Sequence, residues 1–206
     1  INAYYDPTTN EICFPAGILQ APFFDPAADD AANYGAIGVV IGHEMTHGFD
    51  DQGSQFDKDG NLRNWWTPQD KANFKARTQR MIRFFDGIEV LPGLHCNGAL
   101  TCGENIADPG GLKVAYQAFR NATSSRPLAD FGGFTPDQRF FISYGQIWAN
   151  NIRPEALRNQ VKTDPHAPAR WRVNGALPQI EAWYKAFGIK KGDKLFVPKN
   201  KRVDIW

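Results

Sequence analysis

The sequence predicts an α+β domain that is predominantly helical and has a small β-sheet near its start. Two short strand-like segments open the chain, whereas most later segments repeat their apolar residues at helical spacing. Prolines stand where several of these helices would begin. With 206 residues, 42% of them hydrophobic and 13% aromatic, the chain is expected to fold as one domain, residues 1–206, around a real core.

The first elements expected along the chain are strands at residues 3–5 and 11–14. The intervening Asp6-Pro7-Thr8-Thr9-Asn10 is rich in residues that favour turns and would join the two strands. An apolar segment follows, in which Asn33 is expected to cap the start of a helix and Gly48 to close it. Glycines weaken this helix in isolation, so we expect it to be buried and held by packing.

This expected helix contains the motif His43-Glu44-Met45-Thr46-His47, an HExxH pattern. Residues at i and i+4 lie one above the other on a helix face, so both imidazoles can bind one metal ion. Glu44 lies at the edge of the same face, within reach of a water that Zn²⁺ would make acidic at neutral pH. The alternative is a chance match on a buried helix. A metal would give buried histidines the partners they need, which favours the metal site.

A catalytic zinc needs a third protein ligand, and spacing leaves its identity open. The extended pattern HExxHxxGxxH is excluded, because Asp50 and Gly53 stand where it requires Gly and His. Glu104 and Asp108 would share one face if their segment is helical. Glu104 would then bind the metal and Asp108 would hold a ligand histidine from behind. Alternatively, both are solvated carboxylates at a helix start.

Prolines mark the expected starts of most remaining helices. Residues 50–64 are polar and are expected to form a loop or a short hairpin, and one helix should follow Glu104 and run to about Phe119. The other starts are Thr67-Pro68, Thr135-Pro136, Pro154 and Pro178, and Gly188 is expected to close the last helix. The inner faces of the two longest of these would carry Phe74, Thr78, Met81, Phe85 and Ile88, and Phe140, Tyr144, Ile147 and Trp148.

Pro109 interrupts the pattern around the candidate third ligand. Proline removes a helical hydrogen bond and disfavours helical geometry at the preceding residue, here Asp108. A helix that starts near Gly103 would accommodate Pro109 at the edge of its first turn. An earlier start predicts a kink between Glu104 and Leu112 that would alter the aim of Asp108.

Charge and cysteine content exclude several classes of protein. The net charge of +1 argues against a nucleic-acid-binding or membrane-surface role, and no apolar run approaches the length of a membrane span. Three cysteines do not make a disulfide framework, and free thiols are favoured over a pairing of Cys96 with Cys102. The chain starts at Ile1 without a methionine or signal peptide, so we expect a fragment or a processed product.

Five sequence blocks, in order, resemble the neprilysin family of zinc endopeptidases, which includes the endothelin-converting enzymes and bacterial relatives. The blocks are Asn2-Ala3-Tyr4-Tyr5, residues 14–20 with Pro22-Phe23-Phe24, residues 40–51 around the HExxH motif, residues 103–108, and residues 162–168 followed by Arg172. Animal members of the family have a cysteine near the C-terminal tryptophan. This chain has none near Trp206, which suggests a bacterial member.

The resemblance implies a thermolysin-like zinc-helix catalytic domain that hydrolyses oligopeptides. One Zn²⁺ per chain would be bound by His43, His47 and Glu104, with Glu44 as the general base. Asp108 would support a ligand histidine, His166 would stabilise the oxyanion, and His95 would be a surface or loop residue. The alternative is a non-catalytic zinc- or peptide-binding fragment, inactive without an N-terminal helical half that family members have.

The resemblance also implies which residues bind the peptide substrate. Asn2 and Ala3 resemble the edge segment that hydrogen-bonds an extended peptide, and Arg172 resembles the residue that holds a substrate carbonyl. A pocket for a bulky apolar residue after the cleaved bond would comprise Phe23, Val39, Val40, Ile147 and Trp148, although each is equally explained as core. The implied partners are oligopeptides and the N-terminal helical half, with no nucleic acid. The implied location is periplasmic, secreted or membrane-anchored facing outside.

Overall fold

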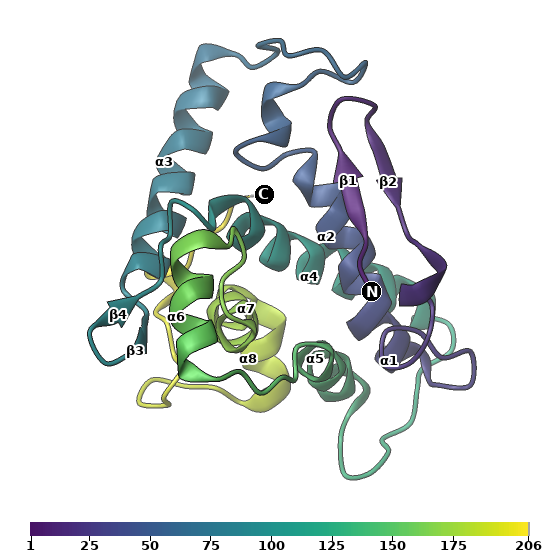
Figure 1. Ribbon diagram of the computed structural model, residues 1–206. Helices are drawn as coiled ribbons and strands as arrows, with labels where there is room; N and C mark the ends of the chain where they lie inside the picture. The colour runs from purple at the N-terminus through teal and green to yellow at the C-terminus, as the bar shows by residue number, and fades with distance from the viewer. Residues whose placement is uncertain (206) are drawn as a thin grey trace.

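Helices dominate the computed structural model, which describes residues 1–205 (Figure 1). The helices are α1 (Asp30–Asn33), α2 (Val39–His47), α3 (Pro68–Asp86), α4 (Cys102–Thr123), α5 (Pro136–Ile147), α6 (Pro154–Thr163), α7 (Ala169–Ala176) and α8 (Glu181–Phe187). A wide π-helical turn, Tyr34–Gly38, joins α1 to α2. The α+β, predominantly helical class that the sequence predicted is confirmed.

The strands form two small antiparallel pairs. Strand β1 (Tyr4–Asp6) pairs with β2 (Glu11–Cys13), with Tyr5 opposite Ile12, so the predicted N-terminal strands are confirmed to within one residue. A second pair, β3 (Glu89–Leu91) with β4 (Leu94–His95), was not predicted. The reason is that its strands are only two or three residues long, too short to show an alternating pattern.

The helical stretch that leads into the HExxH motif begins earlier than predicted, because α1, the π-helical turn and α2 follow one another without a gap. The N-cap of α1 is Asp29, whose carboxylate accepts a hydrogen bond from Ala32 N at 2.8 Å. The prediction of Asn33 as N-cap was wrong, because the Asn33 side chain instead exchanges two hydrogen bonds with the backbone of Asp25. The predicted closing residue, Gly48, is confirmed as the C-cap of α2.

The helix starts predicted at a proline are confirmed where a threonine precedes the proline. Thr67 and Thr135 cap α3 and α5 through their hydroxyls, and Thr135 forms a complete capping box with Gln138. Pro154 opens α6 as predicted. Pro178 does not open a helix: it lies in a short 3₁₀ turn, Leu177–Gln179, and α8 starts at Glu181 after an extended Ile180. Helix α7 was not predicted.

Helix α4 is longer than the sequence suggested and contains Pro109 in its interior. It starts at Cys102, ahead of Glu104, and ends at Thr123, four residues beyond the predicted Phe119. The helix continues through the proline without a break in its assignment, and Pro109 is buried. The longer helix places Glu104 in its first turn and leaves most of its length free for packing.

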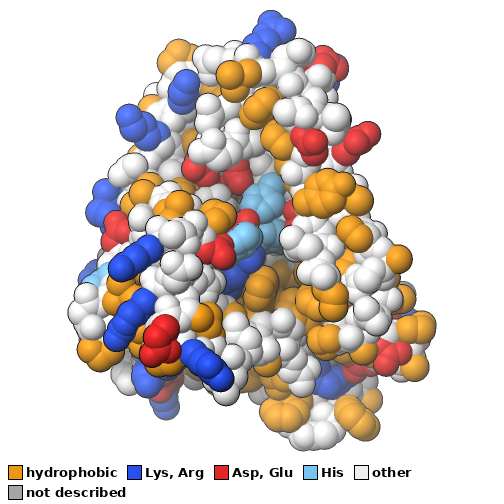
Figure 2. Space-filling model, viewed as in Figure 1, with side chains coloured by type: hydrophobic (Ala, Val, Ile, Leu, Met, Phe, Trp, Pro, Cys, Tyr) orange, Lys and Arg blue, Asp and Glu red, His pale blue; other side chains and the backbone are white. Residues whose placement is uncertain are grey.

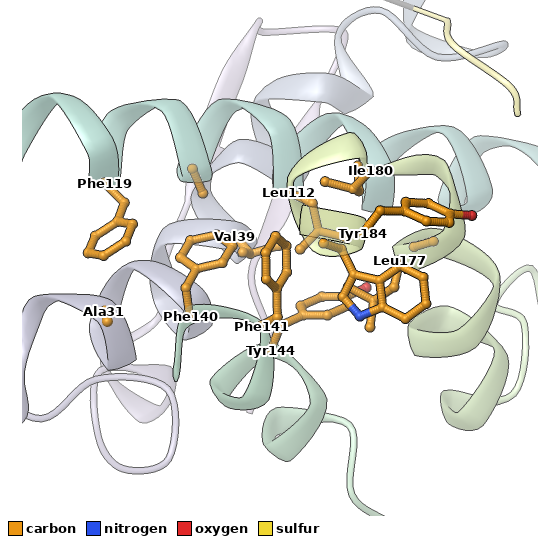
Figure 3. Packing of buried hydrophobic residues seen from close by; sticks show 13 residues of the cluster. Ala31, Val39, Leu112, Phe119, Phe140, Phe141, Tyr144, Leu177, Ile180 and Tyr184 are labelled. Carbon is orange, nitrogen blue, oxygen red and sulfur yellow. The ribbon is translucent and has the colours of Figure 1, made fainter. Parts of the chain in front are cut away.

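The main core lies along α4, between this helix, α5 and α8 (Figure 3). Its aromatic side chains pack closely, with the rings of Phe119 and Phe140 5.7 Å apart. Burying each such side chain contributes about 1.5–3 kcal/mol. A second cluster joins α3 to the start of α4 through Met81, Phe85 and Ile106. Helix α4 is therefore held at both ends, which fixes the segment that carries Glu104.

The structure bears on the predicted state of the cysteines and on possible membrane spans. All three cysteines, Cys13, Cys96 and Cys102, are free thiols, as favoured from the sequence. None of the described helices is both long enough and apolar enough to cross a membrane.

Candidate metal centre and active site

Helices α2 and α4 bring three potential ligand residues together. His43 Nε2 and His47 Nε2 lie 3.0 Å apart. Glu104 Oε2 is 3.2 Å from the first nitrogen, and Glu104 Oε1 is 3.4 Å from the second. These residues form the one group of potential metal ligands found among the described residues. The sequence left the third ligand open, and the structure places Glu104 beside both histidines.

The spacing of these atoms tests whether a zinc ion fits. Tetrahedral ligands at about 2.0–2.1 Å from Zn²⁺ are separated from one another by about 3.3–3.4 Å. The separation of the two Nε2 atoms, 3.0 Å, and the distances from each to one oxygen of the Glu104 carboxylate, 3.2 and 3.4 Å, agree with that geometry after small side-chain adjustments. Two imidazole nitrogens and a carboxylate are also donors that zinc prefers. The residues present therefore fit a zinc site of the catalytic type, with three protein ligands.

Each histidine is held from behind by a carboxylate. His43 Nδ1 lies 2.9 Å from Asp108 Oδ1, as expected for the supporting role assigned to Asp108, so Pro109 does not divert this side chain. His47 Nδ1 lies 2.7 Å from Asp50 Oδ2. Such contacts fix the tautomer and the ring orientation of ligand histidines.

Asp50 was missed by the sequence reasoning as a functional candidate. Its other oxygen, Oδ1, accepts hydrogen bonds from the backbone nitrogens of Gln52 and Gly53 at 2.8 and 2.7 Å. These bonds lock the carboxylate in the turn that follows α2. The spacing in the sequence could have indicated this role. Asp50 follows His47 by three residues, so at a helix end its carboxylate can reach the imidazole.

Arg172, on the unpredicted helix α7, is buried behind the site. It donates two hydrogen bonds to Asp108, at 2.8 and 2.7 Å, and its Nη2 lies 2.8 Å from Glu104 Oε2. Its guanidinium also stacks on the ring of Trp148, 4.0 Å from the ring centroid. Arg172 thus connects the carboxylate behind His43 to the third candidate ligand, and it also borders the cavity described below.

Glu44 and His166 come from distant parts of the sequence and line the same cavity. Glu44 is buried on α2, beside the first histidine of the motif. His166 follows α6 and is only partly buried; its Nε2 lies 3.3 Å from Glu104 Oε1, and its Nδ1 lies 2.6 Å from Asp164 Oδ1. The fourth histidine, His95, is exposed on β4 and contacts the carbonyl of Asp86.

The electrostatics of the site follow from burial and close partners. Burial raises the pKa of Glu44, against the lowering influence of the neighbouring imidazoles, which suits a proton acceptor near neutral pH. Burial alone would lower the pKa of His47, but the carboxylates of Asp50 and Glu104 outweigh it and raise that pKa to about 10. For Glu104, burial is outweighed by the surrounding histidines and Arg172, which hold its pKa well below the usual range.

A cavity of about 420 Å³ opens over these residues. Figure 2 shows pale-blue histidine side chains in a central hollow of the surface, with apolar side chains beside it. All the residues predicted to contact substrate line this cavity: Asn2, Ala3, Phe23, Val39, Val40, Ile147, Trp148 and Arg172. Val39 is 2% exposed, so it belongs to the core as much as to the cavity wall. Lining residues that were not predicted include Tyr5, Ile18 and Tyr144.

Comparisons with known proteins agree with this geometry. Residues 2–203 match the model of peptidase family M13. The chain is 44% identical to endothelin-converting enzyme 1 of Rattus norvegicus over 209 residues, and 41% identical to neprilysin of Homo sapiens over 211 residues. Each alignment covers 100% of this chain, but the chain spans only 27% and 28% of those two relatives.

Solved structures give the same result. The crystal structure of the Mycobacterium tuberculosis zinc metalloprotease Zmp1 in complex with an inhibitor matches with a TM-score of 0.97 and 46% identity, covering 100% of this chain and 32% of that one. The crystal structure of PepO from Lactobacillus rhamnosis matches with a TM-score of 0.89 and 41% identity, covering 100% and 31%. The resemblance stated from the sequence blocks is therefore confirmed.

Proposed function

The chain belongs to peptidase family M13, and on that basis we propose that it is the catalytic part of a zinc-dependent endopeptidase that cleaves oligopeptides. The observation that carries this proposal is the cluster of His43, His47 and Glu104, whose ligand atoms lie 3.0–3.4 Å apart. Glu44, a buried potential proton acceptor, borders the same cavity. One Zn²⁺ per chain would be held by the three ligand residues.

The zinc ion, when bound, would supply Lewis-acid activation of a water molecule at neutral pH. Glu44 would take a proton from the attacking water and pass it to the leaving amine. His166 would donate from Nε2 to the oxygen that becomes negatively charged on the substrate, while Asp164 orients the ring through Nδ1. Asp108 and Asp50 would keep the two ligand histidines in place.

The cavity wall supports a preference for bulky apolar residues just after the cleaved bond. Phe23, Val40 and Ile147 are apolar and partly buried, and Trp148 closes the wall next to Arg172. Pockets of this kind derive most of their affinity from apolar contact. Asn2 and Ala3, just ahead of β1, would hydrogen-bond the extended peptide. Arg172 already binds the carboxylates of Asp108 and Glu104, so an N–H group that it donates to a substrate carbonyl would also have to serve these carboxylates.

We also infer that an N-terminal helical half completes the cleft, because the relatives are much longer than this chain. The chain covers only about a quarter of the endothelin-converting enzymes it matches. Several large apolar side chains are exposed, among them Ile1 at 82% and Tyr4 at 54%, and both of these line the cavity. A covering half would exclude water and strengthen the electrostatic contacts within. A location outside the cytoplasm, whether periplasmic, secreted or membrane-anchored, stays a prediction.

The alternative function is a zinc- or peptide-binding fragment that is not catalytic by itself. The exposure of cavity-lining side chains such as Tyr4 favours this alternative for the isolated residues 1–206. Comparing kcat/KM of residues 1–206 with that of a longer form of the protein distinguishes the two. The proposal predicts zinc binding by both forms but poor cleavage of large peptides by the shorter one. Equal activity of both would show that an N-terminal half is dispensable.

The catalytic proposal is tested by Glu44→Gln. This change removes the proton acceptor but keeps both histidine ligands, so zinc content should stay at one per chain while peptide cleavage is almost lost. Glu155→Gln, at an exposed position on α6, is the matched control and should keep full activity. Peptidase activity retained by zinc-loaded Glu44→Gln would refute Glu44 as the base.

A further inference from the structure

The two helices that carry the candidate ligands touch backbone to backbone. A methyl group at Gly42 of α2 would lie 2.9 Å from both Cα and O of Gly111 in α4. A methyl group at Gly111 would lie 2.6 Å from His43 N and 2.7 Å from Val39 O. These distances are well inside van der Waals contact, and the opposing atoms are backbone that cannot rotate away. Only glycine fits on both sides of this contact.

A third glycine extends the contact along the helices. A methyl group at Gly110 would lie 2.6 Å from Thr46 Cγ2 and 2.7 Å from its Oγ1. Thr46 is buried, and its hydroxyl donates a 2.6 Å hydrogen bond to the carbonyl of Gly42, which holds the side chain in this position. The close approach therefore spans two successive positions of α4.

This contact matters for the metal site because the ligands lie on opposite helices. His43 follows Gly42 directly, and Glu104 lies seven residues, or about two helical turns, before Gly111 on α4. Packed helices with ordinary side chains between them are separated by about 8–10 Å. Carbon atoms prefer separations of about 3.5–4.0 Å, so relief of a 2.6 Å contact requires a shift on the order of 1 Å. Ligand distances at a metal tolerate only about 0.2 Å.

We infer that Gly42, Gly110 and Gly111 are positioning residues, which set the helix separation at which the ligand atoms converge on one metal ion. The inference rests on the proposed function and deepens it, because it assigns the metal geometry to a backbone contact outside the ligand set. Gly145, in α5, provides the contrast: a methyl group there meets nothing within 4 Å. The absence of a side chain is therefore required at the α2–α4 contact and not at Gly145.

The test uses Gly42→Ala and Gly111→Ala in the protein as it is naturally produced. Zinc affinity is measured by competition with a chromogenic chelator, and Co²⁺ is substituted to read the ligand geometry from its visible absorption. We expect each alanine to weaken zinc binding at least tenfold and to change the Co²⁺ spectrum, as changes to ligand-orienting residues do. Gly145→Ala is the matched control. It should keep the zinc affinity within twofold of that of the natural protein and leave the Co²⁺ spectrum unchanged.

A loss of stability must be separated from a loss of positioning. Phe119→Leu removes volume from the core at the far end of α4, so it should lower the unfolding temperature without changing zinc affinity or the Co²⁺ spectrum. Gly42→Ala combined with Gly111→Ala should weaken binding by less than the product of the single effects, because both open the same contact. If Gly111→Ala does not fold, Gly42→Ala, with its longer 2.9 Å contacts, decides the question.

Two results would overturn the inference. One is a folded Gly42→Ala protein with the natural zinc affinity and Co²⁺ spectrum. The other is an equal loss of zinc affinity in Phe119→Leu, which would assign the effect to general destabilisation. A natural protein that binds no zinc at His43 and His47 would instead refute the proposed function, so the two failures are distinguishable.

Discussion

The metal side and the substrate side of the cavity are built differently. On the metal side, α2 and α4 meet through glycine backbone, and carboxylates buried in the fold hold the ligand histidines. On the substrate side, the walls come from the chain start, the end of α5 and the segment around His166, where residues such as Ile1 and Tyr4 are exposed. The candidate ligands and the carboxylates behind the histidines all lie within these residues, whereas the substrate side is more exposed, as the proposed covering by a further part of the protein would require.

This difference predicts separable effects. Changes on the metal side should lower zinc affinity, whereas changes on the substrate side should lower turnover or alter peptide preference with zinc still bound.

The largest effect is expected for His166→Ala, on the substrate side. Removing a donor to the developing oxyanion typically lowers kcat by about 10²–10³. The rise in KM should be smaller, because the contact strengthens as charge develops on the substrate. Steady-state kinetics of the zinc-loaded protein measures both parameters. His95→Ala, an exposed histidine outside the cavity, is the control. An unchanged kcat would make His166 an ordinary loop residue.

A smaller effect is expected on the metal side from Asp50→Asn. The change keeps the shape of the turn but removes the charge that orients His47 Nδ1. Loss of such a partner typically weakens metal binding by about 10–100-fold. Chelator competition measures this change, with Asp59→Asn on the exposed loop as the matched control. Equal zinc affinities for both variants would show that Asp50 serves only the turn.

A change in peptide preference is expected from Phe23→Ala. Enlarging the apolar pocket should reduce the preference for Phe over Ala after the cleaved bond, by about tenfold, because small changes in apolar contact are worth about 1–3 kcal/mol. The ratio of kcat/KM for two peptides that differ at that position is the readout. Phe134→Ala, on an exposed loop, should leave the ratio unchanged. If Phe23→Ala also leaves this ratio unchanged, Phe23 belongs to the hydrophobic core and does not form part of the substrate pocket.

The smallest effect concerns thiol reactivity in the cluster that joins α3 to the start of α4. Burial, aided by the charge of Asp86, raises the pKa of Cys96 to about 11. Little thiolate is then present at pH 8, and access is restricted as well. Alkylation with iodoacetamide should therefore modify the partly exposed Cys13 before Cys96, as mass spectrometry of proteolytic peptides would show. Equally fast modification of Cys96 would mean that this face opens readily.

The sequence predicted the features that rest on local signals. The HExxH motif, the helix starts at Thr67-Pro68 and Thr135-Pro136, and the C-cap at Gly48 all depend on neighbours within one or two turns. Glu104 had only an ambiguous local signal. It was assigned through the family resemblance, and the structure then placed it beside both histidines.

Features set by contacts distant in sequence were not predicted. The start of the motif helix was misplaced because the Asn33 side chain bonds back to Asp25 rather than capping the helix. Helix α7 is short and rich in residues without a clear apolar repeat, yet it brings Arg172 to Asp108, 64 positions away. The contact of Gly42 with Gly111 likewise appears only when the helices cross, because either glycine alone looks like a weakness in its helix.

The central claim is that His43, His47 and Glu104 hold one zinc ion, and locating the metal tests it most directly. Anomalous diffraction at the zinc absorption edge, from crystals of the zinc-loaded protein, shows where the ion lies. The account predicts one peak per chain, with Nε2 of both histidines and a Glu104 carboxylate oxygen at about 2.0–2.2 Å. A principal peak at His95 or Cys96, or a zinc ion bound without Glu104, would contradict the account.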